Sequence, residues 1–262
     1  MAGPERISEH VLWLAPGPPD RPSLCAVLGE RRTLMLDAGS SAAHARLLLD
    51  GLSTPPSHVA LTHSHWDHVF GAAEVGAPVI AHSLTAAALR TLAATDWSDE
   101  ALDRRVAAGE DSAQHAANVK EELPSPRDVQ VAQADLVFED GLDVELGGAT
   151  VRIRHVGGDH ASDSCAMYVE PDGVLFLGDC LYDSPDGRLT PERVFPLYEA
   201  VLGFGAELFV EGHGERVVPR SELEGLAAKL RQAHELVEAG ETVPEGADAD
   251  LAFFVGAFAA GR

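Results

Sequence analysis

Basic residues are scarce in this sequence, and their scarcity restricts the partners it can have. Lys and Arg together number 19 against 42 Asp and Glu, which gives a formal net charge of −23 at pH 7. Such an excess of negative charge repels nucleic-acid backbones and anionic membranes over long distances. We therefore predict no nucleic-acid partner and no membrane partner, and we expect a small-molecule substrate.

Cysteines and long apolar runs are few as well. Cys25, Cys165 and Cys180 are odd in number and lack zinc-finger spacing, which argues against a disulfide framework. No apolar run approaches the roughly 18 residues of a membrane span, and the first residues lack the apolar core of a signal peptide. These absences predict a cytoplasmic protein.

The chain is nevertheless long enough to bury a large core. It has 262 residues, of which 45% are hydrophobic, and we expect a single domain over residues 1–262. Short apolar runs predict strands at 11–14, 24–28, 33–36, 59–61, 79–81, 136–138, 142–146, 150–154, 166–169 and 174–177. Helical patterns occupy 42–52, 69–75, 84–94, 191–202 and 221–239. Strands followed by helices in both halves predict an α/β fold of two packed sheets with helices outside.

Two segments depart from this alternation. Residues from about 96 to 126 are polar and helix-forming, so they form either a helical cap at the substrate entrance or a solvated helix without function. C-terminal helices are expected over about 221–260. There Phe253, Phe254 and Phe258 either pack within the chain or contact a second subunit, which makes a homodimer one of two outcomes.

The densest chemical signal is the run T-H-S-H-W-D-H at 62–68, which follows an apolar strand. Neutral imidazole is the commonest metal ligand, and imidazole with carboxylate suits zinc and other divalent first-row metals. His63 and His65 fall on one face of an extended chain, whereas Asp67 and His68 lie on the turn into a helix and point at a second position. The run therefore predicts the beginnings of two metal sites, with Trp66 as a wall beside them.

Four ligands in one loop cannot complete two coordination shells. Further His, Asp or Cys side chains are therefore expected at later strand ends, and three segments meet this requirement. Each places a ligand-type residue beside glycine, which permits the tight turns of a crowded site. The three residues are His160, Asp179 and His213.

This ordered series resembles the metallo-β-lactamase fold superfamily of metal-dependent hydrolases over roughly residues 7–215. The H-x-H-x-D-H run, the Gly-x-His segment at 158–160, the strand ending in Gly178-Asp179 and the late Gly212-His213 pair carry the resemblance. It implies an α/β (α+β) fold, a four-layer αββα sandwich with the metals at one edge between the sheets.

The resemblance also implies a complete ligand set for a binuclear centre. The residues it assigns are His63, His65 and His160 for one metal, Asp67, His68 and His213 for the other, and Asp179 as a bridge. Zinc is the expected metal, with manganese and iron as alternatives. Asp37 resembles the aspartate that orients ligands without touching metal, and otherwise it is a turn residue.

The chain is therefore predicted to be an enzyme, a binuclear metallo-hydrolase. Two neighbouring cations would lower the pKa of a bridging water and polarise a carbonyl oxygen. The bridging hydroxide would attack a lactone, ester, thioester or β-lactam, with Asp67 orienting it. Tyr182 lies three residues after Asp179, a spacing found in lactonases of the superfamily, where the phenol helps to hold the substrate oxygen. The alternative for Tyr182 is aromatic packing.

Some residues depart from the patterns of individual subgroups. The sequence Gly158-Asp159-His160-Ala161 stands where many members have Pro-Gly-His-Thr, which weakens the thioesterase interpretation. The 91 residues between His68 and His160 exceed the corresponding spacing of the lactonases. A metal-dependent phosphodiesterase and a single-iron, dioxygenase-like member therefore stay as alternatives, although the acidity of the chain disfavours the first.

The remaining histidines lack the setting of a strand end flanked by glycine. We expect most of them to be surface or packing residues: His10, His44, His58, His82, His115, His155 and His234. Cys180 follows Asp179 directly and should point to the opposite face, so we expect a buried core thiol there.

Overall fold

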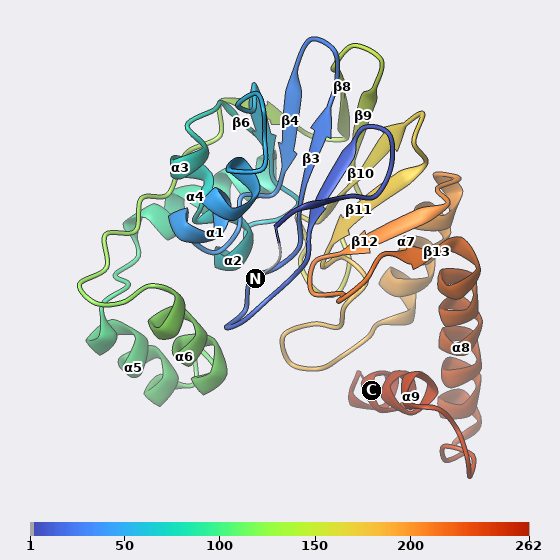
Figure 1. Cartoon of the computed structure of the whole chain (residues 1–262). Helices are drawn as coiled ribbons and strands as arrows, with labels where there is room; N and C mark the ends of the chain where they lie inside the picture. The colour runs from blue at the N-terminus through green and yellow to red at the C-terminus, as the bar shows by residue number, and fades with distance from the viewer. Residues whose placement is uncertain (1–2, 262) are drawn as a thin grey trace.

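The computed structural model describes residues 3–261, which form two β-sheets packed face to face between two layers of helices (Figure 1). Within those residues the first sheet has seven strands in the order β1 to β7. The second has six strands in the order β13-β12-β11-β10-β9-β8. The predicted four-layer αββα sandwich is confirmed.

The first half of the chain forms the first sheet and the helices on its outer face. The strands are β1 (Glu5–Arg6), β2 (Val11–Leu14), β3 (Leu24–Leu28), β4 (Thr33–Leu36), β5 (His58–Ala60), β6 (Val79–His82) and β7 (Leu136–Phe138). The helices are α1 (Ala42–Leu49), α2 (Trp66–Val69), α3 (Ala72–Val75), α4 (Ser83–Ala94), α5 (Asp99–Ala108) and α6 (Ala113–Glu122). An antiparallel meander from β1 to β4 thus continues into the parallel strands β4 to β7.

The second half forms the second sheet and the helices that cover it. Its strands are β8 (Gly141–Glu145), β9 (Thr150–His155), β10 (Cys165–Glu170), β11 (Val174–Gly178), β12 (Leu208–Glu211) and β13 (Val218–Pro219). Its helices are α7 (Pro191–Gly203), α8 (Arg220–Ala239) and α9 (Ala249–Ala260). β11 and β12 are parallel, and the other neighbours in this sheet are antiparallel.

The central strands are mainly apolar, as expected for strands with both faces covered. In β4, Leu34 and Leu36 point between the sheets, whereas Met35 packs under the helices of the first half. In β11, Phe176 points between the sheets and Leu177 packs toward α7 and α8. Alternate side chains of one strand thus pack into two different cores.

Several strands end at one edge of the sandwich. The parallel pairs β4–β5 and β11–β12 run toward this edge, and the two sheets are joined there by the Cys165 amide, which donates to the Thr62 carbonyl at 2.8 Å. Side chains that follow these strands are therefore brought close together although they are far apart in the sequence.

The expected helix over 69–75 is wrong in its limits. The chain forms two short helices instead, and α2 begins at Trp66, inside the predicted metal-binding run. Gly71 lies between the two helices. Only glycine fits at this position, because a Cβ there would lie 2.0 Å from the Ala38 carbonyl oxygen. The helix expected over 42–52 ends at Leu49, and the two-residue strands β1 and β13 were too short to give a periodic signal.

The polar segment at 96–126 folds as α5 and α6. Leu102, Ala116 and Val119 pack into the core beneath the first sheet. The buried Glu122 accepts hydrogen bonds from Arg21 Nε at 2.8 Å and from the Ser41 hydroxyl. These contacts attach the two helices to the sandwich beside the edge where the strands end.

The C-terminal helix packs largely within the chain. Phe254 and Phe258 are buried, and Phe253 keeps 51% of its surface exposed. Cys180 is buried in the same core, which confirms its predicted place, and Cys25, Cys165 and Cys180 are all free thiols. Within residues 3–261 no helix combines the length and apolarity that crossing a membrane requires.

His44 is a buried histidine whose protonation opposes folding. It lies in α1 with 1% of its surface exposed, and its Nδ1 faces the Ser40 amide at 3.2 Å. Burial and then the charge of Arg21 lower the pKa of its imidazole to about 3. The unfolded chain, with a His pKa of about 6.5, takes up this proton first. The free energy of unfolding therefore falls as the pH decreases from about 6.5 toward 3.

We expect this imidazole to cost about 2 kcal/mol of stability between pH 6.5 and pH 5. A His44→Asn variant keeps an acceptor for the Ser40 amide but has no titrating ring. Denaturant unfolding of both chains after chelation, at each pH, measures the difference. Identical acid sensitivity in the two chains would contradict the assignment.

Candidate metal centre

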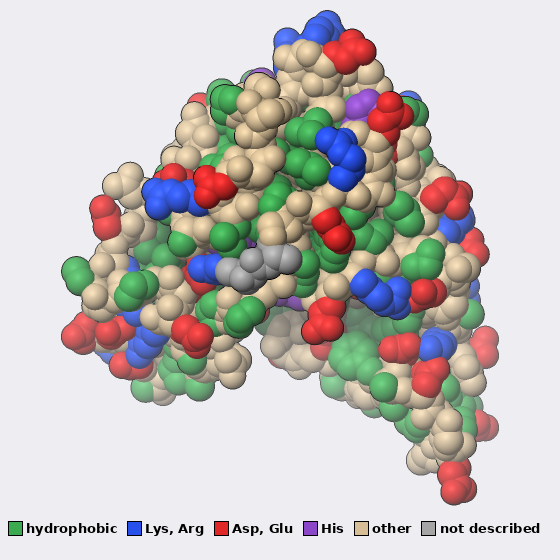
Figure 2. Space-filling model, viewed as in Figure 1, with side chains coloured by type: hydrophobic (Ala, Val, Ile, Leu, Met, Phe, Trp, Pro, Cys, Tyr) green, Lys and Arg blue, Asp and Glu red, His purple; other side chains and the backbone are tan. Residues whose placement is uncertain are grey.

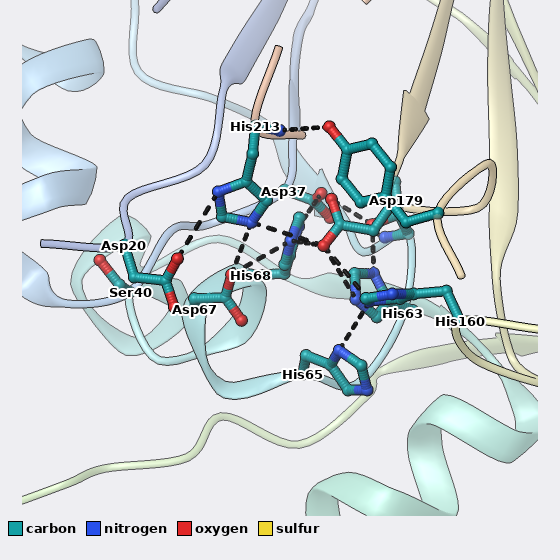
Figure 3. A network of polar contacts seen from close by, with 12 residues as sticks. Asp20, Asp37, Ser40, His63, His65, Asp67, His68, His160, Asp179 and His213 are labelled. Atoms are coloured by element: carbon teal, nitrogen blue, oxygen red, sulfur yellow. Dashed lines mark hydrogen bonds and ion pairs between the residues drawn. The ribbon is translucent and has the colours of Figure 1, made fainter. Parts of the chain in front are cut away.

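The seven predicted ligand side chains converge at the edge where β5, β9, β11 and β12 end (Figure 3). They form two groups that correspond to the two predicted metal sites. One group is His63, His65, His160 and Asp179, and the other is Asp67, His68, His213 and Asp179. Within each group the candidate ligand atoms lie within 4.8 Å of one another.

The run 62–68 divides between the groups because its backbone changes conformation. His65 is the N-cap residue of α2 and has extended dihedral angles, φ −65° and ψ 145°. His63 and His65 therefore precede the helix, whereas Asp67 and His68 lie in its first turn. The two parts of one short loop consequently point at two adjacent positions.

Asp179 lies at the centre of the arrangement. Its Oδ2 is 3.2 Å from His68 Nε2 and 3.3 Å from His160 Nε2. The same oxygen is 3.5 Å from His213 Nε2 and 3.9 Å from His63 Nε2. Because imidazoles from both groups face this carboxylate, it is the side chain best placed to contact two cations at once.

Asp37 holds two of the imidazoles in a defined tautomer. Its Oδ1 accepts the Thr62 amide, and its Oδ2 accepts both the Thr62 hydroxyl and His68 Nδ1–H, each at 2.7 Å. The Thr62 oxygen, having donated its proton, is 3.0 Å from His63 Nδ1 and accepts from it. His63 and His68 therefore turn their Nε2 atoms toward Asp179.

Two further imidazoles are oriented from the second half of the chain. His160 Nδ1 donates to the Asp183 carbonyl at 3.3 Å, and its Nε2 faces His65 Nδ1 at 3.0 Å. His213 Nε2 lies 3.1 Å from Asp67 Oδ2. Each ring thus directs one nitrogen inward, which is the arrangement that a bound cation requires.

The electrostatics of the site favour bound positive charge. Burial lowers the pKa of His63 well below its usual range and that of His65 to about 4, so both imidazoles are neutral at pH 7. Burial also acts to lower the pKa of His68 and His213, but the neighbouring carboxylates outweigh this effect, with the largest contribution from Asp179. They raise the pKa of His68 well above its usual range and that of His213 to about 10. The negative charge held here is balanced by protons that a divalent cation would displace.

The residues fit a divalent cation on two structural grounds. Among the described residues, His63 Nε2 and Asp179 Oδ1 are buried side-chain atoms without a hydrogen-bond partner, a costly situation that a cation would relieve. A Cβ at Gly212 would lie 1.9 Å from Asp179 Oδ1, so the backbone leaves room for glycine alone. Imidazole and carboxylate donors at this spacing suit zinc.

A large cavity opens beside these side chains. Its volume is about 1080 Å³, and its walls include His65, Asp67, His160, Asp179 and His213. Trp66 also lines it, as predicted. The opposite wall comes from α4 and from the loop between α5 and α6. The inserted segment at 96–126 therefore contributes directly to the space in which a ligand would lie.

Tyr182 lies at the junction of this cavity and the ligand cluster. Its phenol oxygen accepts a hydrogen bond from the His213 amide at 3.1 Å. Burial, followed by the charges of Glu211 and Asp179, raises the pKa of the phenol far above its ordinary value. Tyr182 is therefore a neutral hydroxyl whose proton remains free to donate to a ligand.

Sequence reasoning missed Asp20, Thr62 and Trp97 as residues of the site. Asp20 Oδ1 lies 3.8 Å from His213 Nδ1, while its other oxygen accepts from Asn118 of α6 at 2.8 Å. It belongs to an irregular proline-rich loop and gives no pattern. Thr62 is the first residue of the run at 62–68, and its place beside His63 was the available signal. Trp97 lines the cavity from the inserted segment, where no period marks it.

The discounted histidines stay outside both groups. Within residues 3–261, none of them belongs to a cluster that could hold a metal. His82 and His155 stack with ring centroids 4.0 Å apart, and His10 binds Asp172 at 2.7 Å. His115 differs from the expectation in one respect, since it lines the cavity and contacts Trp66 edge to face.

Replacing Thr62 by valine should weaken metal binding about 10- to 100-fold, the range typical for loss of a partner that orients a ligand. Without the hydroxyl, nothing fixes the proton on His63 Nδ1. A competition titration with a chromophoric zinc chelator measures the affinity. Thr62→Ser keeps the hydroxyl and should restore it, whereas equal weakening in both variants would contradict a role through the hydroxyl.

Comparison with known proteins agrees with this geometry. A sequence model described as the Metallo-beta-lactamase superfamily matches residues 18–239. The chain is 25% identical over 215 residues to an acyl-coenzyme A thioesterase of Bos taurus, and the match covers 76% of this chain and 72% of that protein. It is 29% identical over 177 residues to an uncharacterized protein of Mycobacterium bovis, covering 63% and 70% of the two chains.

Solved structures share the fold. A metallo-beta-lactamase family protein from Thermus thermophilus superposes with a TM-score of 0.64 at 20% identity, covering 97% of this chain and 92% of that one. Taken with the match over residues 18–239, the fold and the clustered His and Asp side chains lead to one conclusion. The chain belongs to the metallo-beta-lactamase superfamily, whose members are generally metal-dependent hydrolases.

Proposed function

We propose that this protein is a binuclear metallo-hydrolase, with zinc as its metal, that cleaves a small carbonyl substrate such as a lactone, ester, thioester or β-lactam. The observation that carries the proposal is the sharing of Asp179 between two ligand groups beside a cavity of about 1080 Å³. The similarity to an acyl-coenzyme A thioesterase supports attack at an ester-type carbonyl.

The proposed assignment gives each side chain a definite task. Two bound cations would acidify a shared water and polarise the carbonyl oxygen. His63, His65 and His160 would hold one cation, and Asp37 keeps ring nitrogens turned inward through the Thr62 hydroxyl. Asp67 would accept a hydrogen bond from the attacking water and so orient it toward the carbonyl.

Tyr182 would act as a donor in this reaction. Its oxygen is held by the His213 amide, and its high pKa keeps the proton on the phenol, which suits donation to the developing oxyanion. We expect Tyr182→Phe to lower kcat about tenfold or more while metal content stays unchanged. Steady-state kinetics with elemental analysis of the same sample measure both quantities. An unaltered kcat would assign Tyr182 to packing.

The proposed function is tested by measuring metal content and turnover on one preparation. Close to two equivalents of zinc, manganese or iron are expected, and chelation should abolish hydrolysis across a panel of lactone, thioester, ester and β-lactam substrates. Full activity of the chelated protein would refute the mechanism. A single equivalent of iron with oxygen-dependent turnover would favour the dioxygenase-like alternative. Turnover of phosphodiesters alone would favour a metal-dependent phosphodiesterase.

A further inference from the structure

The cavity beside the ligand cluster has two chemically different parts, which bear on the substrate of the proposed function. One wall carries the candidate ligands, and the facing wall is built by α4 and by the segment that contains α5 and α6. Figure 2 shows a hollow between the lobe of α5 and α6 and the lower part of the molecule around α9. A substrate placed with its carbonyl at the ligands would therefore extend toward α4, α5 and α6.

The part nearest α4 is apolar and aromatic. Trp66, Ala88, Leu92 and Trp97 all line the cavity. Phe70 supports both tryptophans from behind, with ring centroids 6.0 Å from Trp66 and 5.0 Å from Trp97 in edge-to-face contacts. Trp66 is buried and Trp97 is partly buried. Such rigid aromatic surface gains free energy when an apolar chain or ring covers the part that faces the cavity.

The rim of the cavity carries negative charge. Besides the candidate ligands, Asp20, Glu110, Asp111 and Asp186 line it, and among the described residues no Lys or Arg does. The cations Arg105 and Arg188, which pair with Asp111 and Asp186, lie outside this lining. A molecule that enters the cavity therefore meets carboxylates without a Lys or Arg side chain in the described part of the lining.

We infer that the site selects uncharged carbonyl substrates bearing an apolar chain or ring, and excludes acyl groups carried on a polyphosphorylated carrier such as coenzyme A. This inference rests on the proposed function and narrows it. The apolar group packs against Trp66, Leu92 and Trp97, and a phosphorylated carrier that extends out of the cavity would pass the acidic rim. Proteins bind phosphate mainly through Arg and Lys side chains, and the described part of the lining offers neither.

The sharpest test compares two thioesters with the same acyl group. S-hexanoyl-N-acetylcysteamine presents the thioester of hexanoyl-coenzyme A without its phosphates. On the metal-loaded protein we expect its kcat/KM to exceed that of the coenzyme A ester by at least about tenfold at low salt. The gap should narrow at about 0.5 M salt, since rim charges are screened there. An equal or higher kcat/KM for the coenzyme A ester would overturn the inference.

Charge reversal at one rim position tests whether the rim causes the difference in kcat/KM between the two thioesters. Glu110→Lys should reduce the gap between the two thioesters several-fold. Glu121→Lys makes the same change in charge on an exposed position of α6 outside the cavity lining, and should leave the gap unchanged. An equal response to both substitutions would show that net charge, and not this rim, discriminates between the substrates.

A second pair of variants tests whether the apolar part of the cavity binds the acyl chain. Leu92→Ala should raise KM for hexanoyl relative to acetyl thioesters, because it removes surface that the longer chain covers. Leu84→Ala, on the same helix but 47% exposed and outside the lining, is the control and should change neither KM. A chain-length preference unchanged by Leu92→Ala would refute the assigned position of the apolar group.

A binding measurement separates this inference from the proposed function. The thioether analogues S-hexyl-N-acetylcysteamine and S-hexyl-coenzyme A cannot be hydrolysed, and quenching of tryptophan fluorescence reports their binding. Preferential binding of the neutral thioether supports the inference even if neither thioester is hydrolysed, an outcome that would contradict the proposed function alone. Tighter binding of the coenzyme A thioether would overturn the inference whichever ester is cleaved.

Discussion

Replacement of Asp179 by alanine is expected to lower turnover by about 10³-fold or more and to reduce metal content well below that of the parent chain. Asp179 faces imidazoles of both ligand groups, so both cations would lose a ligand in one substitution. Lewis-acid stabilisation by bound cations is worth several kcal/mol, and about 4 kcal/mol corresponds to a 10³-fold change in rate. Elemental analysis and steady-state kinetics on the same preparations measure the two effects.

Asp172→Asn is the matched control for this substitution. Asp172 precedes the other end of β11, where it binds His10 and the Ser8 hydroxyl away from the ligand cluster. The control should therefore keep its metal and its kcat. If Asp179→Ala retained two equivalents of metal, the bridging role would be wrong even where activity was lost.

Gly212→Ala should be nearly as damaging, although it adds only a methyl group. The new Cβ would lie 1.9 Å from Asp179 Oδ1 and 3.2 Å from His68 Cε1. Because a backbone hydrogen bond of 2.7 Å holds Gly212 to Gly178, the chain cannot simply move away. We expect metal affinity to fall by two orders of magnitude or more, on the order of the loss from deleting ligand-orienting contacts, with a lower thermal midpoint.

Gly225→Ala provides the opposite expectation within the same chain. Gly225 lies within the second turn of α8, and a Cβ there meets no atom within 4 Å. This substitution should raise the free energy of unfolding by about 0.5–1 kcal/mol, since alanine favours the helix more than glycine does. Metal titration and thermal unfolding of both variants distinguish a specific clash at Gly212 from a general intolerance of substitution.

The ligand groups were predictable because strand ends and residue chemistry coincide in the sequence. The run at 62–68 changes from extended chain to helix within a few residues, and this change alone separates His63 and His65 from Asp67 and His68. His160, Asp179 and His213 each follow an apolar strand beside glycine, so topology brings them to one edge. Local pattern and fold geometry therefore lead to the same residues.

The walls of the cavity were not predictable in the same way. Asp20 reaches it from a proline-rich loop, and Trp97 and His115 reach it from the inserted segment at 96–126. That segment is attached through Glu122, which binds Arg21 and Ser41. Contacts between residues so far apart in the sequence, such as those of Glu122 with Arg21 and Ser41, give no periodic pattern from which they could be predicted. The helix limits near 66–75 were missed for a related reason, since Gly71 is required by a close approach to Ala38, a residue far away in the sequence.

The distribution of the ligand groups along the chain has a consequence for biosynthesis. His63, His65, Asp67 and His68 leave the ribosome well before His160, Asp179 and His213, and each group takes members from both parts. A nascent chain can therefore offer only incomplete sites until the second sheet has been made and docked on the first. Metal retention would then act as a checkpoint for assembly, since tight holding of the ions requires that both sheets have met.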